Sequence, residues 1–426
     1  MTTLDEGTDL GMPELRRDGL FGVPAAPDPG TRKEFTSDQE VRWCPGCGDY
    51  AVLAAVQGFL PELGLKRENI TFVSGIGCSS RFPYYLDTFG MHSIHGRAPA
   101  IATGLATARG DLSVWVVTGD GDALSIGGNH LIHALRRNVN LTILLFNNRI
   151  YGLTKGQYSP TSETGKVTKS TPMGSIDAPF NPVSLALGAE ATFVARTVDS
   201  DRAHLTSVLR QAAAHRGTAL VEIFQNCPIF NDGAFDSFKG RDTEGSIIPL
   251  VHGQPVRFGA DGSLGVVRAP GGGVRIVETS SVGDDDLLVH DAHADDASTA
   301  FALSRLTDAG HLHQAPIGIF RQVERPTYDD LARQQVSTAR ESLGDGDLAT
   351  LIAGKDAWTV PACPGCGFPG SPGQPHRTQV ASQWGVPACH GELAPNPSAY
   401  GGPVRQGAMP AGMLPGVTHA HSGVHR

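Results

Sequence analysis

The sequence predicts an α/β protein with a mainly parallel β-sheet and helices on both faces. One observation behind this is that, from Trp43 to about residue 234, short apolar runs alternate with longer segments of helical periodicity. Such alternation is typical of parallel strands connected by helices. A second is that glycines and polar residues directly follow several of the apolar runs, as they do where parallel strands end at a ligand-binding edge.

Four apolar runs and four helical segments make up the predicted principal domain, residues 37–234. The strands are expected at Ile70–Val73, Val114–Val117, Leu141–Phe146 and Ala219–Phe224. The helices are expected at about 50–60, 100–109, 124–137 and 201–214.

Residues 235–360 are predicted to form an extension that packs on this domain. The region has glycine-rich turns and a possible pair of short strands, Leu264–Arg268 and Val274–Glu278. A helical pattern follows from Asp295 to Leu306, and the region closes with a further helix at Tyr328–Leu343.

The two ends of the chain differ from this body in composition. Residues 1–36 are rich in Gly, Pro and charge and lack a sustained apolar period, so we predict a flexible arm. Residues 361–426 are dominated by Gly, Pro, Ala, Ser and His, and we predict a disordered tail. A zinc site in the tail is disfavoured because adjacent residues cannot easily both reach one tetrahedral ion. The residues considered for that site are Cys363, Cys366, Cys389 and His390.

Composition narrows the class of protein. The 426 residues carry a formal net charge of -9, which disfavours a nucleic-acid partner. No uninterrupted apolar stretch approaches the roughly 20 residues of a membrane-spanning helix, and the N-terminus lacks a signal pattern. We therefore expect a cytoplasmic protein with no membrane partner. Its seven cysteines include two Cys-Pro-Gly-Cys pairs, which in this compartment indicate metal binding or redox chemistry.

A metal and diphosphate site is indicated by Gly119-Asp120-Gly121-Asp122 and by the later pair Asn147-Asn148. Each follows an apolar run, with a helical segment between them, so both are expected at the carboxyl edge of a parallel sheet. Oxygen ligands from Asp120 and Asn148 suit Mg²⁺, which completes its shell with phosphate oxygens. The two glycines and the start of the helix would let a diphosphate approach the backbone.

Four cysteines are predicted to converge beside this site. Cys44 and Cys47 form one Cys-Pro-Gly-Cys pair, while Cys78 and Cys227 each follow a predicted strand of the same sheet. A structural zinc ion and an iron-sulfur cluster both use four such thiolates, so spacing alone leaves the two open.

The spacing of the Gly-Asp-Gly and Asn-Asn elements resembles the signature of thiamine-diphosphate enzymes. The resemblance implies a thiamine-diphosphate-binding fold, with Mg²⁺ held by the side chains of Asp120 and Asn148 and by the carbonyl of Ile150. It also implies that Gly121, Asp122, Gly152 and Leu153 lie along the cofactor. Because electrons can leave this cofactor one at a time to an adjacent iron-sulfur cluster, but not to zinc, its presence favours the cluster.

The complete pattern resembles the beta subunit of 2-oxoacid:ferredoxin oxidoreductases. The resemblance covers roughly Trp43 to Val360. It is carried by the motifs Trp43–Gly48, Gly75–Ser80, His95–Ala98, Gly119–Asp122 and Asn148–Thr161. The family resemblance implies that Cys44, Cys47, Cys78 and Cys227 bind one [4Fe-4S] cluster. It further implies that Ile76, Gly77, Cys78 and Ser79 touch thiamine diphosphate.

The same resemblance implies the reaction and the partners. Enzymes of this family decarboxylate a 2-oxoacid, pass two electrons through the cluster to ferredoxin and transfer the acyl group to coenzyme A. The alpha subunit supplies the aminopyrimidine-binding domain, so we expect this chain to be inactive alone. A heterodimer that pairs into a heterotetramer is the expected assembly.

Substrate choice is predicted from Arg81, three residues beyond Cys78. A guanidinium can bind a distal carboxylate through a two-pronged contact, which favours 2-oxoglutarate over pyruvate. Leu153 occupies a position where the family places another pocket residue, and His95 and Arg97 could orient the substrate carboxylate or the diphosphate.

Three alternatives remain open at this level. The same reaction could act on pyruvate or another 2-oxoacid, or the chain could belong to a non-redox thiamine-diphosphate decarboxylase or carboligase. The third alternative is a zinc-binding interaction module, which would leave the Mg²⁺ and diphosphate motif unexplained.

Overall fold

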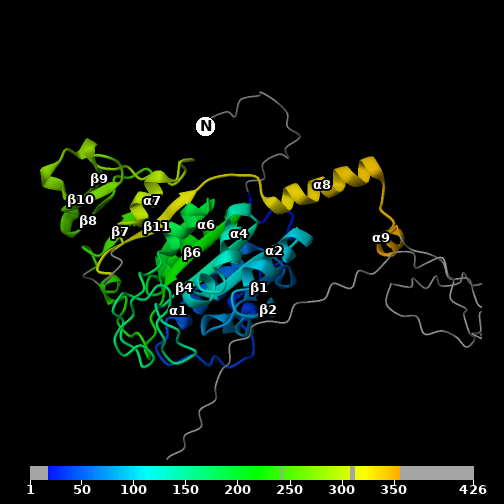
Figure 1. Ribbon diagram of the computed structural model, residues 1–426, viewed down its shortest axis with the longest axis horizontal. Helices are drawn as coiled ribbons and strands as arrows, with labels where there is room; N and C mark the ends of the chain where they lie inside the picture. The colour runs from blue at the N-terminus through cyan, green and yellow to red at the C-terminus, as the bar shows by residue number, and fades with distance from the viewer. Residues whose placement is uncertain (1–17, 241–242, 308–311, 356–426) are drawn as a thin grey trace, which may run out of the picture. The chain divides into compact units, whose positions relative to one another are not determined.

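An eight-stranded sheet forms the centre of the computed structural model, in the order β2-β1-β3-β4-β6-β5-β11-β7 (Figure 1). Strands β1 to β6 are parallel, whereas β11 runs antiparallel to β5 and parallel to β7. The strands span Ile70–Ser74 (β1), Phe89–His92 (β2), Ser113–Gly119 (β3), Leu141–Asn147 (β4), Phe193–Val198 (β5), Thr218–Phe224 (β6), Ile247–Leu250 (β7) and Ala315–Gln322 (β11). This confirms the predicted fold class.

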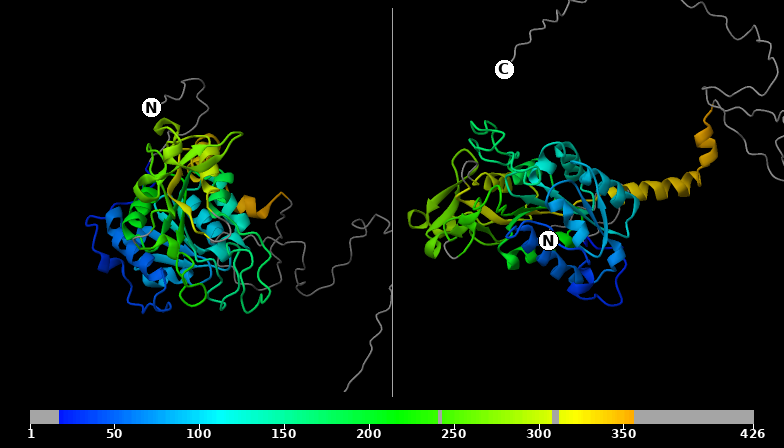
Figure 2. Two further views of the ribbon diagram at one scale, coloured as in Figure 1. Left: turned by 90° about the vertical axis from the view of Figure 1, so that its left-hand side faces the viewer. Right: turned by 90° about the horizontal axis from the view of Figure 1, so that it is seen from below.

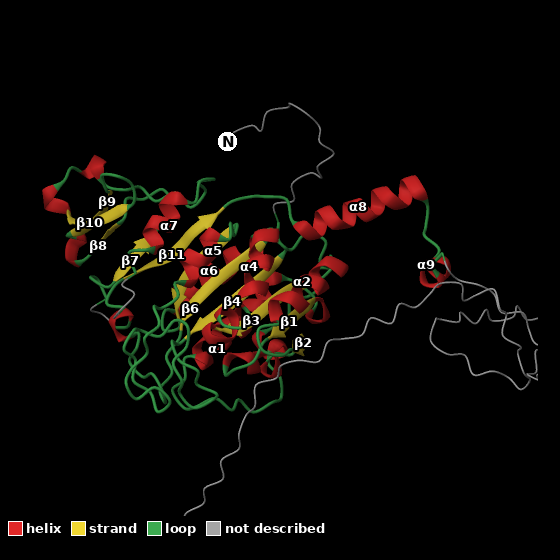
Figure 3. Cartoon of the chain, viewed as in Figure 1, coloured by secondary structure: helices red, strands yellow, loops and turns green. Residues whose placement is uncertain are grey.

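Helices cover both faces of the sheet, as Figures 2 and 3 show. Helices α1 and α6 contribute to one apolar cluster, while α2, α4, α5 and α7 contribute to the other. The helices span Asp49–Phe59 (α1), Ala98–Ala108 (α2), Asp120–Leu124 (α3), Gly128–Arg137 (α4), Pro182–Gly188 (α5), Arg202–Ala214 (α6), Ser298–Ser304 (α7) and Tyr328–Leu343 (α8).

The central strands are apolar along their whole length because both of their faces are buried. In β3, Val114 and Val116 join the cluster under α2, whereas Trp115 and Val117 join the cluster under α1. The ring of Trp115 stacks on Phe72 of β1 with centroids 5.7 Å apart. Burial of each large apolar side chain stabilises the fold by about 1.5–3 kcal/mol. The four strands predicted from apolar runs therefore contribute strongly to its stability.

Strands β5 and β11 were not predicted, because each contains a buried arginine. Arg196 in β5 and Arg321 in β11 are both 1% exposed and interrupt the apolar pattern. The predicted strand pair of the extension does form, as β9 (Leu264–Arg268) and β10 (Val274–Glu278), with Val274 opposite Arg268. A third strand, β8 (Arg257–Phe258), completes this small antiparallel sheet.

The structure describes residues 18–240, 243–307 and 312–355. Contacts divide the chain into two units, Met1–Gly344 and Asp345–Arg426, so the observed boundary precedes the one expected after residue 360. Within the second unit, the described segment contains the short helix α9 (Leu348–Ala353). The cysteines and histidine considered for a zinc site in the tail lie outside the described residues. Among the described helices, none has the length and apolar character needed to cross a membrane.

Residues 18–36 differ from the predicted flexible arm. The backbone N–H of Gly19 donates to the carbonyl of Ala214 at 2.9 Å, and Asp18 forms a bridge with His215. Phe35 is 1% exposed and belongs to the apolar cluster under α1. Backbone pairing and one buried ring therefore fix this segment on the sheet domain, despite its polar composition.

Candidate active site

A pocket lies where β1, β3 and β4 end. All of the residues predicted to contact thiamine diphosphate or Mg²⁺ line it. The lining consists of Ile76, Gly77, Cys78, Ser79, His95, Gly119, Asp120, Gly121, Asp122, Asn148, Ile150, Tyr151, Gly152, Leu153 and Thr154. Because neighbouring parallel strands end at the same edge, segments distant in sequence meet here. The predicted residues outside this lining are Arg81, Arg97, Cys44, Cys47 and Cys227.

Asp120 is the most constrained side chain of the pocket. It is 2% exposed, and its Oδ2 atom accepts hydrogen bonds from the hydroxyls of Ser159 and Thr161, each at 2.5 Å. Burial raises the pKa of the Asp120 carboxyl above its ordinary value, although these two donors act in the opposite direction. A cation beside the carboxylate would offset the cost of burying its charge, so the site fits Mg²⁺.

Asn148 has its side-chain amide oriented by two contacts. Its Nδ2 donates to Gln225 Oε1 at 3.0 Å, and its Oδ1 accepts from the backbone N–H of Ile150 at 3.2 Å. The Asn148 carbonyl is held separately, by a 2.9 Å bond from Asn231 Nδ2. The amide oxygen that the sequence predicts as a metal ligand is thus distinguished from the amide nitrogen by its partners.

Two glycines give the pocket its shape. A β-carbon on Gly121 would lie 2.2 Å from Cε1 of Tyr151, so the backbone and this ring are in direct contact. A β-carbon on Gly152 would lie 3.6 Å from Sγ of both Cys78 and Cys227. At Gly121 there is no room for a side chain, so backbone forms the pocket wall there, as a diphosphate cradle requires.

Asp122 organises the loops around the pocket. Its Oδ1 accepts from the Gly96 N–H at 2.9 Å and contacts His95 Nδ1 at 3.1 Å, while Oδ2 accepts from Thr118 Oγ1 at 3.0 Å. A β-carbon on Gly75 would lie 1.8 Å from Oδ2. The carboxylate therefore joins the loops after β1 and β2 to the start of α3, and His95 enters the pocket lining through it.

Two of the four predicted cluster cysteines lie beside Gly152, and a third contacts Gln225. Sγ of Cys78 and Cys227 flank Gly152, and Cys47 Sγ accepts a hydrogen bond from Gln225 Nε2 at 3.3 Å. Burial raises the pKa of the Cys78 thiol to about 12, and nearby Cys227 and Cys44 contribute to the increase. Such thiols ionise at neutral pH only beside a positive centre, which suits metal ligation.

The same cysteines do not form a site for a single ion. Within the described residues, no three His, Cys, Asp or Glu side chains lie close enough together to hold one metal ion. A zinc ion about 2.3 Å from four sulfurs would keep those sulfurs about 3.8 Å apart. An iron-sulfur cluster has its own atoms between its thiolates, so it does not require all four sulfurs to reach one ion.

Arg81 and Arg97, the basic residues predicted to contact substrate, are not part of the pocket lining. Arg81 is partly exposed within the short helix after Cys78, and its Nη1 donates to the Arg42 carbonyl at 3.4 Å. Its charge is close enough to lower the pKa of Cys78 against the larger effect of burial. Arg97 is the N-cap of α2 and donates to the Ile126 carbonyl at 3.4 Å. Leu153, by contrast, is 45% exposed and belongs to the pocket lining.

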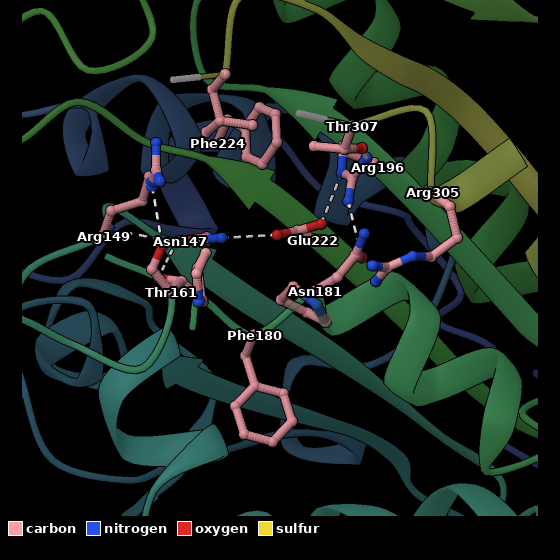
Figure 4. A pocket seen from close by; sticks show the side chains of 13 residues that line it. Asn147, Arg149, Thr161, Phe180, Asn181, Arg196, Glu222, Phe224, Arg305 and Thr307 are labelled. Atoms are coloured by element: carbon pink, nitrogen blue, oxygen red, sulfur yellow. Dashed lines mark hydrogen bonds and ion pairs between the residues drawn. The ribbon is translucent and has the colours of Figure 1, made fainter. Parts of the chain in front are cut away.

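A buried polar chain leads from Thr161, which bonds to Asp120, to Arg196 of β5. Figure 4 shows its members from Thr161 to Arg196, which line a second pocket. Thr161 Oγ1 contacts Asn147 Oδ1 at 2.9 Å, and Asn147 Nδ2 donates to Glu222 Oε1 at 2.7 Å. Glu222 then pairs with Arg196 Nε at 2.7 Å, with both side chains at most 1% exposed. In the sequence, the only indication of these buried polar contacts is a charged residue within each of two apolar strands, Arg196 in β5 and Glu222 in β6.

Other functional residues were missed because their roles depend on tertiary contacts. Ser159 and Thr161 belong to a loop of ordinary polar composition, yet both reach the Asp120 carboxylate. Tyr151 donates from its hydroxyl to the Gly121 carbonyl at 3.0 Å. Gln225 contacts both Asn148 and Cys47. Only the position of Gln225, directly after a predicted strand, could have marked it as a candidate.

The chain is similar to known proteins over most of its length. Residues 75–223 match the family described as thiamine pyrophosphate enzyme, C-terminal TPP binding domain. The chain is 66% identical over 357 residues to the 2-oxoglutarate oxidoreductase subunit KorB of Mycobacterium tuberculosis, an alignment that covers 83% of this chain and 95% of that relative. It is 46% identical over 192 residues to the 2-oxoacid:ferredoxin oxidoreductase subunit beta of Saccharolobus solfataricus, which covers 45% of this chain and 63% of that relative.

A solved structure shares the fold. The 2-oxoglutarate:ferredoxin oxidoreductase from Magnetococcus marinus, with 2-oxoglutarate, coenzyme A and succinyl-CoA bound, superposes with a TM-score of 0.58 at 35% sequence identity. The superposition covers 76% of this chain and 95% of that chain.

Proposed function

Because the chain belongs to the family of 2-oxoacid:ferredoxin oxidoreductase beta subunits, we propose that it is the beta subunit of a 2-oxoglutarate:ferredoxin oxidoreductase. The enzyme converts 2-oxoglutarate and coenzyme A to succinyl-CoA, CO₂ and a proton, and passes two electrons to ferredoxin. The observation that carries this proposal is the 66% identity to a 2-oxoglutarate oxidoreductase subunit over nearly the full length of that relative. An alpha subunit completes the active site, and we place the complex in the cytoplasm, where thiols stay reduced.

We propose that Asp120, Asn148 and the Ile150 carbonyl hold Mg²⁺, and that the backbone around Gly121 and Gly152 receives the diphosphate. When bound, thiamine diphosphate supplies the carbon that attacks the 2-oxo group and takes up the electron pair left when CO₂ departs. Ser159 and Thr161 hold the Asp120 carboxylate in place through its Oδ2 atom. Ile76, Gly77, Ser79, Asp122 and Leu153 line the same pocket and complete the proposed contacts.

Cys44, Cys47, Cys78 and Cys227 are the proposed ligands of a [4Fe-4S] cluster. Cys78 also lines the pocket, so the proposed cluster and thiamine diphosphate share one loop. The indole N–H of Trp43 donates to the Cys78 carbonyl at 2.7 Å and anchors this loop against the segment that contains Cys44. Electrons would thus move a short distance within one rigid edge of the sheet before they reach ferredoxin.

The test is anaerobic viologen reduction by the chain purified with its alpha partner, with coenzyme A and either 2-oxoglutarate or pyruvate. We expect reduction that requires 2-oxoglutarate and is lost in Cys78→Ala. Reduction with pyruvate alone would preserve the family but overturn the substrate. A complex that holds its cluster and thiamine diphosphate but reduces no viologen would contradict the redox function.

Arg81→Ala tests the proposed substrate contact. We expect the KM for 2-oxoglutarate to rise about 10- to 100-fold, because a hydrogen bond to a charged group contributes about 1.5–3 kcal/mol. The KM for coenzyme A should stay constant in the same steady-state assay. Arg109→Ala, which removes an exposed arginine paired with Asp111, is the matched control. An unchanged KM for 2-oxoglutarate in Arg81→Ala would remove Arg81 from the substrate site.

A further inference from the structure

Gln225 connects the two proposed cofactor sites through one side chain. It directly follows β6, is 1% exposed, and its backbone N–H donates to the Asn147 carbonyl at 3.0 Å. Its side-chain Oε1 accepts from Asn148 Nδ2 at 3.0 Å, and its Nε2 donates to Cys47 Sγ at 3.3 Å. Nε2 also donates to the Asn226 carbonyl. Both donors and the oxygen of this buried amide are therefore used.

On the Asn148 side, Gln225 selects which atom faces the proposed metal. An asparagine amide can turn over and exchange its oxygen and nitrogen at little cost unless its neighbours distinguish them. The Gln225 oxygen accepts only from the nitrogen, so the Asn148 oxygen remains on the side of the Ile150 N–H. Loss of this acceptor would leave a partly buried Asn148 N–H without its partner and weaken the preference.

On the Cys47 side, Gln225 donates a hydrogen bond to a proposed cluster thiolate. Hydrogen bonds to cluster sulfurs are among the features that set reduction potential. An N–H donor offsets negative charge on sulfur, and the reduced cluster carries one more negative charge than the oxidised one. The bond from Gln225 Nε2 therefore stabilises the reduced state more than the oxidised state.

We propose that Gln225 is a positioning residue that couples occupancy of the Mg²⁺ and diphosphate site to the reduction potential of the cluster. A cation on the Asn148 oxygen withdraws charge from that amide and makes its N–H a stronger donor to Gln225. Hydrogen bonds in such chains polarise one another, so the Gln225 N–H becomes a stronger donor to Cys47. The inference rests on the proposed function, since it requires both cofactors.

The consequence is reciprocal. If a loaded cofactor site favours the reduced cluster, then reduction of the cluster strengthens cofactor binding by the same factor. The cluster becomes a better electron acceptor only when the site that generates electrons is filled. Through this one amide, the chain would suppress reduction of the cluster before a cofactor is in place.

The experiment measures the cluster potential by EPR at controlled potentials, in the alpha-beta complex with and without Mg²⁺ and thiamine diphosphate. In the wild-type complex we expect binding of Mg²⁺ and thiamine diphosphate to favour reduction of the cluster about tenfold. This corresponds to a positive shift of about 59 mV in its one-electron reduction potential. Gln225→Met removes both contacts, and we expect a lower potential, no shift on loading and weaker thiamine diphosphate binding. Gln225→Glu keeps an acceptor for Asn148 but removes the donor to Cys47, so binding should persist while the shift is lost.

Gln57→Met is the matched control. Gln57 is also a buried glutamine, and it bonds to Arg32 and to the Tyr85 carbonyl instead of either proposed site. It should retain the wild-type shift. If the potential of Gln225→Glu still shifts when Mg²⁺ and thiamine diphosphate bind, the inference is overturned. This test holds even if Gln225→Met fails to assemble. A wild-type complex that binds both cofactors without any shift overturns the coupling alone, whereas one that binds no cluster overturns the proposed function.

Discussion

Replacement of Asp120 by alanine should reduce the activity of the alpha-beta complex at least about 10³-fold, equivalent to about 4 kcal/mol of lost stabilisation. The carboxylate is the only charged ligand proposed for Mg²⁺, and its position is fixed by hydroxyls from Ser159 and Thr161. Without it, the metal that joins the diphosphate to the protein loses its principal anchor. Viologen reduction measures the activity, and equilibrium dialysis of thiamine diphosphate with Mg²⁺ measures the binding that should fail with it.

A second substitution at the same position, Asp120→Asn, separates the effect on folding from the effect on cofactor binding. Since burial raises the pKa of the Asp120 carboxyl, its charge is costly to the protein without a cation, and Asp120→Asn should leave the thermal stability of the cofactor-free complex equal or higher. Asp111→Asn removes an exposed carboxylate paired with Arg109 and serves as the control for net charge. Wild-type thiamine diphosphate affinity in Asp120→Ala would refute the assigned role.

Glu222→Ala should destabilise the complex by about 3–5 kcal/mol, because it leaves the Arg196 guanidinium buried without its counter-charge. The Asn147 amide would lose its acceptor at the same time. For a chain of 426 residues, the melting temperature should fall by about 3–6 °C in a thermal unfolding scan. The effect would appear with and without cofactors, unlike the effect of Asp120→Ala.

Two variants sharpen the interpretation of this loss. Arg196→Met combined with Glu222→Leu should recover much of the stability, since removal of both charges avoids the cost of an unpaired one. Glu62→Ala breaks an exposed pair with Arg210 and should change the melting temperature far less. Equal melting temperatures for Glu222→Ala and Glu62→Ala would contradict the structural importance of the buried pair.

The parallel core could be predicted because its strands are buried on both faces and so appear as continuous apolar runs. The candidate site could be predicted in outline for a related reason: Asp120, Asn148 and Cys78 follow those runs directly, and parallel strands bring such positions to one edge. The family resemblance added the pairing of these positions with particular cofactors, which spacing alone left open.

The parts that could not be predicted depend on contacts between distant segments. Arg196 interrupts the apolar pattern of β5, and its partner, Glu222, lies on another strand, so the sequence does not reveal the pair. Ser159 and Gln225 have common side chains whose function arises only where they meet Asp120, Asn148 and Cys47. Residues 18–36 were expected to be flexible because composition does not reveal backbone pairing with the end of α6.

The placement of both proposed cofactor sites on the ends of adjacent buried strands has a consequence for electron transfer. Loops anchored at both ends by a packed sheet shift little when charge moves between groups that they hold. Little shift means a small reorganisation energy, the structural cost that each electron must overcome. If both cofactors bind as proposed, the buried sheet would do more than position their ligands: it would also limit how far those ligands shift when an electron moves between the two sites.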